Sequence, residues 1–174
     1  MQKHFIPLII VVLLFSVLPD ITRAQSAKEA FGSLEKLEAR CQVKGMSYQD
    51  FRSGLADARF EVNRFLESPQ AAENNEITDS IRKVMSHYDF ANKVWFADIR
   101  MKAMRSYLGP KGEPGQEALG RYPMASKNYK EGGALSGPRE NVILVEYLLP
   151  IIWNEASEEL KGTEARLLEM AAGL

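Results

Sequence analysis

The sequence predicts an all-α protein, an antiparallel bundle of about four principal helices with one long, irregular, Gly/Pro-rich loop. Three observations lead to this fold. Residues 141–155, NVILVEYLLPIIWNE, are apolar around nearly the whole circumference of a helix, which is typical of a helix buried in a core or a membrane. Two earlier stretches carry an apolar stripe at helical spacing. Glycine and proline are concentrated in a loop at residues 107–137, where they exclude a long helix.

The first 24 residues are predicted to be a signal peptide. Lys3 supplies a positive charge, residues 5–18 are apolar, and Thr22-Arg23-Ala24 offers small residues on both sides of an arginine before the cleavage point. Cleavage after Ala24 would leave residues 25–174 as a single helical-bundle domain. We therefore expect an exported protein, periplasmic or secreted. The alternative is an uncleaved signal anchor, and only then would the protein be associated with a membrane.

Charge and cysteine content narrow the class of protein further. The 174-residue chain has a formal net charge of −1, which removes the electrostatic basis for binding nucleic acid. Cys41 is the single cysteine, so the chain cannot form an internal disulfide. Its position on the apolar face of a helix predicted at residues 26–42 favours a small buried side chain. A reactive or intermolecular thiol is the alternative.

The next two helices are indicated by capping residues and by periodicity. Ser47 is the expected N-cap of a helix whose apolar stripe steps by three and four residues from Tyr48 to Phe65, and Pro69 is expected to end it. A polar loop follows at residues 72–76, and a third helix is predicted at residues 76–104. Consecutive helices with a short link predict an antiparallel hairpin.

The most apolar helix is predicted to run from residue 138 to residue 161. Pro138 suits the first helical position, whereas Pro150 falls inside the helix and predicts a kink. Gly162 is expected to cap or interrupt the helix before a last segment at residues 164–171.

Motifs for catalysis and for metal binding are missing from the sequence. His87 is the single histidine after the signal peptide, and there is no nucleophile elbow, no phosphate-binding glycine motif and no set of several His and Cys ligands. We therefore predict no catalytic residues, no metal site and no cofactor, and we expect that the protein is not an enzyme. His87 is predicted to be a polar or half-buried helix residue.

The main functional prediction concerns the loop. Eight basic and four acidic residues lie between Asp98 and Arg139, a local charge of about +4, and tyrosines are interspersed among them. The loop either binds an anionic partner, a protein or an anionic envelope component, or it folds back on the acidic C-terminal helix or is merely solvated. The residues predicted to form the binding surface are Arg121, Tyr122, Lys127, Tyr129 and Lys130.

A pocket beside the kinked helix is the alternative prediction. A kink at Pro150 would separate the helices locally and leave room for a small ligand, as in a carrier or an enzyme. The residues predicted to line this pocket are His87, Trp95, Glu146, Tyr147 and Trp153.

Overall fold

The computed structural model describes residues 27–100, 107–108, 113–125 and 143–172. Helices dominate this part of the chain, so the all-α prediction is confirmed. The first helix covers residues 27–41. The other elements are α2 (Tyr48–Leu66), α3 (Pro69–Glu73), α4 (Asn75–Arg100), β1 (Tyr107–Leu108), α5 (Gly115–Arg121), β2 (Ile143–Leu144) and α6 (Val145–Ala172).

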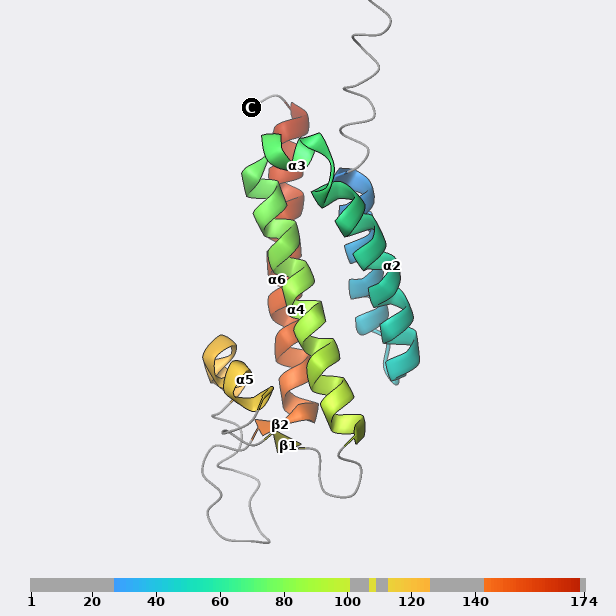
Figure 1. Ribbon diagram of the computed structural model, residues 1–174, viewed down its shortest axis with the longest axis vertical. Coiled ribbons are helices and arrows are strands. Elements are labelled where there is room, and N and C mark those ends of the chain that lie inside the picture. Colours follow the sequence, from blue (N-terminus) through green and yellow to red (C-terminus); the bar gives the residue numbers. More distant parts are fainter. Residues whose placement is uncertain (1–26, 101–106, 109–112, 126–142, 173–174) are drawn as a thin grey trace, which may run out of the picture.

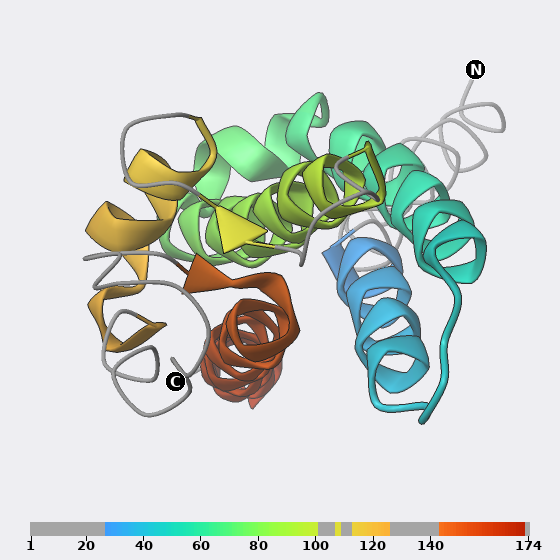
Figure 2. The ribbon, with the colours of Figure 1, turned by 90° about the horizontal axis from the view of Figure 1, so that it is seen from below.

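The long helices are arranged as two pairs. In Figure 1, α4 and α6 lie side by side over most of their length and run in opposite directions, and the view from below in Figure 2 agrees. The first helix and α2 form the second pair, and α3 links α2 to α4 at one end. At the other end β1 pairs antiparallel with β2, Tyr107 opposite Leu144 and Leu108 opposite Ile143. This ribbon ties together the two ends of the segment that connects α4 to α6.

The predicted start and apolar stripe of α2 are confirmed. The hydroxyl of Ser47 accepts a hydrogen bond from the backbone N–H of Asp50, which satisfies one of the free donors of the first turn. The buried stripe residues are at most 1 % exposed: Phe51, Leu55, Ala58, Val62 and Phe65. A spacing of three and four residues therefore identified the core-facing side of this helix.

The link between α2 and α4 differs from the predicted polar loop. Helix α2 ends at Leu66, and Pro69 begins the short helix α3. The prediction was wrong because a proline that cannot continue one helix is well suited to the first position of another. Helix α4 begins at Asn75, and the predicted end near residue 104 lies outside the described residues.

Helix α6 corrects two predicted boundaries. It begins at Val145, because Ile143 and Leu144 are paired with β1, and the predicted start at Pro138 lies outside the described residues. It also continues through Gly162, where a glycine inside a helix costs only about 1 kcal/mol relative to alanine. Pro150 lies inside α6 and is exposed, and the predicted kink there stays a prediction.

The core lies mainly between α4 and α6. Leu148, Ile152 and Ala156 of α6 are fully buried, and so are Ile81 and Val84 of α4. Tyr147 is 48 % exposed, so α6 is not buried on all sides as its apolar sequence suggested.

No helix within the described residues combines the length and the apolar character needed to cross a membrane. The predicted signal peptide lies outside the described part of the chain.

Candidate functional site

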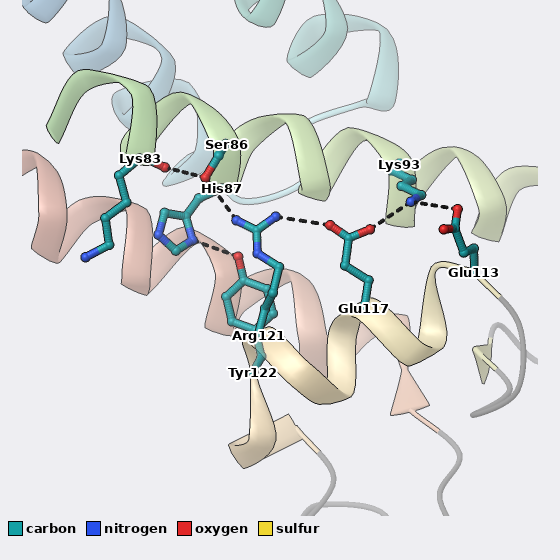
Figure 3. A network of polar contacts seen from close by, with 8 residues as sticks. All are labelled: Lys83, Ser86, His87, Lys93, Glu113, Glu117, Arg121 and Tyr122. Carbon is teal, nitrogen blue, oxygen red and sulfur yellow. Dashed lines mark hydrogen bonds and ion pairs between the residues drawn. The ribbon is translucent and has the colours of Figure 1, made fainter. Parts of the chain in front are cut away.

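A polar and aromatic contact fastens the segment around α5 to α4. The hydroxyl of Tyr122, the residue that follows α5, lies 2.7 Å from Nδ1 of His87 on α4 (Figure 3). Both side chains are buried, Tyr122 at 2 % exposure and His87 at 9 %. The Tyr122 ring also stacks on Phe90, with 5.6 Å between ring centroids and 21° between planes. The contact therefore combines a buried hydrogen bond with apolar packing.

Charged side chains from the two helices continue this contact toward the end of α4. The ammonium group of Lys93 donates to Glu117, at 2.7 Å, and to Glu113, at 3.1 Å (Figure 3). The other carboxylate oxygen of Glu117 accepts from Arg121 at 3.3 Å. Charges of opposite sign thus alternate from Lys93 of α4 to Glu117 and then to Arg121 of α5.

Arg121 completes the network between α5 and α4. Its guanidinium group donates to the hydroxyl of Ser86, at 3.0 Å, and lies 5.0 Å from the centre of the Phe90 ring and 5.5 Å from that of Tyr122. Such stacking adds about 0.5–2 kcal/mol per contact, depending on exposure. We call the eight residues of Figure 3 the α5 anchor: Lys83, Ser86, His87, Lys93, Glu113, Glu117, Arg121 and Tyr122.

The electrostatics of the α5 anchor keep His87 neutral. Burial lowers the pKa of His87 to about 4, and the positive charges of Arg121 and Lys83 act in the same direction, while Glu159 opposes them. Burial also raises the pKa of Tyr122 to about 12. At neutral pH a neutral imidazole and a protonated phenol therefore share this hydrogen bond.

The contact between His87 and Tyr122 is better suited to holding α5 on α4 than to acid–base catalysis. A general base must reach the proton it removes from a substrate. Nδ1 of His87 is already occupied by Tyr122, and the ring is almost fully covered. The α5 anchor is therefore a docking contact between two helices.

The five residues of the predicted binding surface fall into two groups. Arg121 and Tyr122 belong to the α5 anchor, and Tyr122 is buried, so it cannot contact a partner while α5 is docked. Lys127, Tyr129 and Lys130 lie outside the described residues. The predicted irregular loop also contains the short helix α5.

The residues of the alternative pocket fall into separate places. Trp95 and Trp153 are in contact, with 5.9 Å between ring centroids, and Trp95 also packs beside Phe51 at 5.5 Å. His87 is eight residues from Trp95 on the same helix, roughly 12 Å along its axis, and faces Tyr122. Glu146 and Tyr147 are exposed in the first turn of α6. The structure therefore brings together two of the five predicted residues.

Several members of the α5 anchor were not predicted. Lys93, Glu113, Glu117 and Ser86 carry no motif, and the one local signal is the spacing of four residues between Glu117 and Arg121, which favours an ion pair on a helix. The contact of Lys93 with Glu117 joins positions 24 residues apart, which no local pattern indicates.

Comparisons of the chain with models of known protein families, with curated proteins and with solved structures find no match. Within the described ranges, no group of three or more His, Cys, Asp or Glu side chains is placed to hold a metal ion. The functional argument therefore depends on the residues of this chain alone.

Proposed function

We propose that this is an exported protein, periplasmic or secreted, that binds an anionic envelope component or an acidic protein and catalyses no reaction. Binding would use the segment between α4 and α6, with Arg121, Lys127, Tyr129 and Lys130 at the contact and Tyr122 as an anchor. The proposed export follows from the N-terminal sequence, with its positive charge, apolar stretch and small residues before the cleavage point.

The observation that carries this proposal is the docking of α5. The segment between α4 and α6 is tied at its ends by β1 and β2 and in its middle by the α5 anchor. Fixing the backbone of the described residues 113–125 costs about 1–2 kcal/mol per residue in conformational entropy, which the buried contacts of Ala118, Tyr122 and Ala125 help to offset. The same segment carries the local excess of basic residues. A basic segment held at one end of a helical scaffold is suited to contacting an anionic surface.

Charge reversal provides a direct test. The variant with Lys127→Glu and Lys130→Glu is compared with a variant carrying Lys28→Glu and Lys36→Glu, two exposed lysines of the first helix. The probes are vesicles of phosphatidylcholine with or without phosphatidylglycerol, an acidic polysaccharide and an acidic protein. We expect the first variant to bind its anionic probe roughly 30-fold more weakly or worse, because each basic residue near an anionic surface contributes about 1 kcal/mol. The second variant should bind like the wild type.

Equal binding by the two variants, or binding that is insensitive to salt, would contradict the proposal. A deletion of residues 110–133 is a poorer test, because it would remove the buried side chains of Ala118, Tyr122 and Ala125 from the core. Export has its own test. N-terminal sequencing of the exported protein should begin at Gln25, whereas a start at Met1 would favour the signal anchor.

A small-ligand carrier is a second candidate, which one observation favours. The indole N–H of Trp153 is buried and has no hydrogen-bond partner among the described residues, although its ring touches that of Trp95. A buried donor of this kind usually has a partner, and a bound ligand could supply one. Trp95 and Trp153 are the two tryptophans of the chain, so tryptophan fluorescence reports on the surroundings of this pair. Native mass spectrometry that finds only the bare chain, together with unchanged fluorescence after extraction with solvent, would remove this candidate.

A further inference from the structure

We propose that acid controls the docking of α5: protonation of His87 releases residues 113–125 from α4, and docking returns when His87 is neutral. The release itself is independent of any partner. Its consequence, an acid-sensitive presentation of the basic segment, rests on the function proposed above.

His87 lies where an imidazolium ion would be poorly tolerated. Arg121 faces it from α5, Lys83 from its own helix, and Glu159 from α6. Within the described part of the chain, Glu159 is the acidic group that acts on His87, and it is already engaged because it pairs with Lys83 at 2.6 Å and with Arg166 at 3.9 Å. A proton on His87 would therefore add a third positive charge to a buried place where the one carboxylate is shared.

The same proton would disturb the hydrogen bond that holds Tyr122. A neutral His87 with its ring proton on Nε2 offers Nδ1, 2.7 Å from the hydroxyl of Tyr122, as an acceptor for the hydroxyl proton. Once Nδ1 carries a proton it can only donate, and the buried hydroxyl proton of Tyr122 loses its acceptor. Glu155 of α6 also acts on Tyr122 electrostatically, but no hydrogen bond joins the two in the described part of the chain. Undocking returns both groups to water.

The direction of the effect follows from the two states of His87. Its pKa is about 4 when α5 is docked and near 6.5 in water, so the released state binds the proton more tightly. Docking is therefore at full strength above about pH 6.5 and weakens as the pH falls toward 4. Between pH 7 and pH 5 the docking equilibrium should fall on the order of 20-fold.

Glu117 does not share this pH range. Burial acts to raise its pKa, but hydrogen bonds from Lys93 and Arg121 and their positive charges outweigh burial, so the pKa of Glu117 lies below its ordinary value of 4.5. Its ion pairs stay intact until the solution is more acidic than about pH 4.5. The fall in docking between pH 7 and pH 5 is therefore assigned to His87 and not to Glu117.

Amide hydrogen exchange on the full chain tests this proposal. The observable is the protection of residues 115–121, corrected for the intrinsic pH dependence of exchange, with buried amides of α4 as the internal reference. In the wild type, protection of α5 should fall roughly 20-fold between pH 7 and pH 5, while α4 stays protected. His87→Asn places an amide oxygen near the position of Nδ1 and does not titrate, so its α5 protection should not change with pH. Lys36→Asn, a change of an exposed side chain on the first helix, should behave like the wild type.

Constant α5 protection in the wild type between pH 7 and pH 5 would overturn the proposal, as would the same pH dependence in His87→Asn. If His87→Asn fails to fold, NMR titration of the chain that begins at Gln25 decides, because His87 is its single histidine. A midpoint at or above about 6 would overturn the proposal. A midpoint near 4 with loss of α5 protection as the pH falls supports it. Neither measurement involves a partner, so the charge-reversal test can fail while acid release succeeds.

Discussion

The hydroxyl of Tyr122 and Nδ1 of His87 are 2.7 Å apart, although the two residues are separated by 35 positions in the chain. The contact joins the end of α5 to the middle of α4, and Phe90 and Arg121 pack against it. Because both polar groups are buried, each depends on the other for its hydrogen bond. The position of α5 should therefore be sensitive to small changes at this pair.

Tyr122→Phe should lower the free energy of unfolding by about 1–2 kcal/mol. The substitution keeps the stacking on Phe90 but leaves Nδ1 of His87 buried without a partner. Urea unfolding at pH 7 measures the effect. Tyr147→Phe is the matched control, since its hydroxyl belongs to an exposed side chain, and it should change stability by less than about 0.5 kcal/mol. Equal effects of the two substitutions would mean that the buried hydrogen bond contributes nothing.

Leu148→Asp should destabilise the protein by about 3 kcal/mol or more. Leu148 is fully buried between α6 and α4, and a carboxylate there would have no partner. Thermal unfolding followed by circular dichroism measures the loss. Tyr147→Asp introduces the same group one residue away on the exposed side of α6 and should be tolerated. If Leu148→Asp unfolds at the same temperature as Tyr147→Asp, the packing of α6 on α4 is not as described.

The parts of the fold that could be predicted are those with local signals. Ser47 caps α2, and the spacing from Phe51 to Phe65 matches its buried face. The start of α6 could not be found in this way. Leu144 is held in a strand by Tyr107, which lies 37 positions earlier, so an apolar stretch that suits a helix is shortened by a tertiary contact.

The candidate site could likewise be predicted only where local sequence signals exist. Charge and aromatic content singled out Arg121 and Tyr122, but whether Tyr122 points to solvent or to the core depends on Phe90 and His87 of another helix. His87 was expected to be polar or half-buried, and it is buried at the edge of the core. Its role as the acceptor for Tyr122 required the arrangement of α5 on α4, for which the sequence carries no local pattern.

Substitution by alanine should change the free energy of unfolding differently at two glycines that lie inside helices. At Gly162 a Cβ would meet nothing within 4 Å, so Gly162→Ala should raise the free energy of unfolding by about 1 kcal/mol through helix propensity. At Gly54 a Cβ would lie 2.8 Å from Nη1 of Arg40 and 3.2 Å from Cδ1 of Leu37. The tip of Arg40 can move, but Leu37 is buried in the core.

Gly54→Ala should therefore gain less than Gly162→Ala, by about 1 kcal/mol or more, because overpacking against Leu37 offsets the propensity. Urea unfolding of both variants measures the difference. An equal gain in the free energy of unfolding at both positions would show that the first helix can move away from α2 without loss of stability.

Cys41 provides a prediction at alkaline pH. Burial raises the pKa of this thiol from 9.0 to about 12, and the negative charge of Glu38 acts in the same direction. The folded chain therefore keeps the proton that the unfolded chain releases above pH 9, so stability should fall as the pH rises from 9 toward 12. Burial raises the pKa of Tyr88 as well, which adds to the loss. Between pH 8 and pH 10 the wild type should lose about 1 kcal/mol more than Cys41→Ala, measured by urea unfolding. Equal losses would mean that the thiol ionises freely in the folded chain, as a reactive cysteine would.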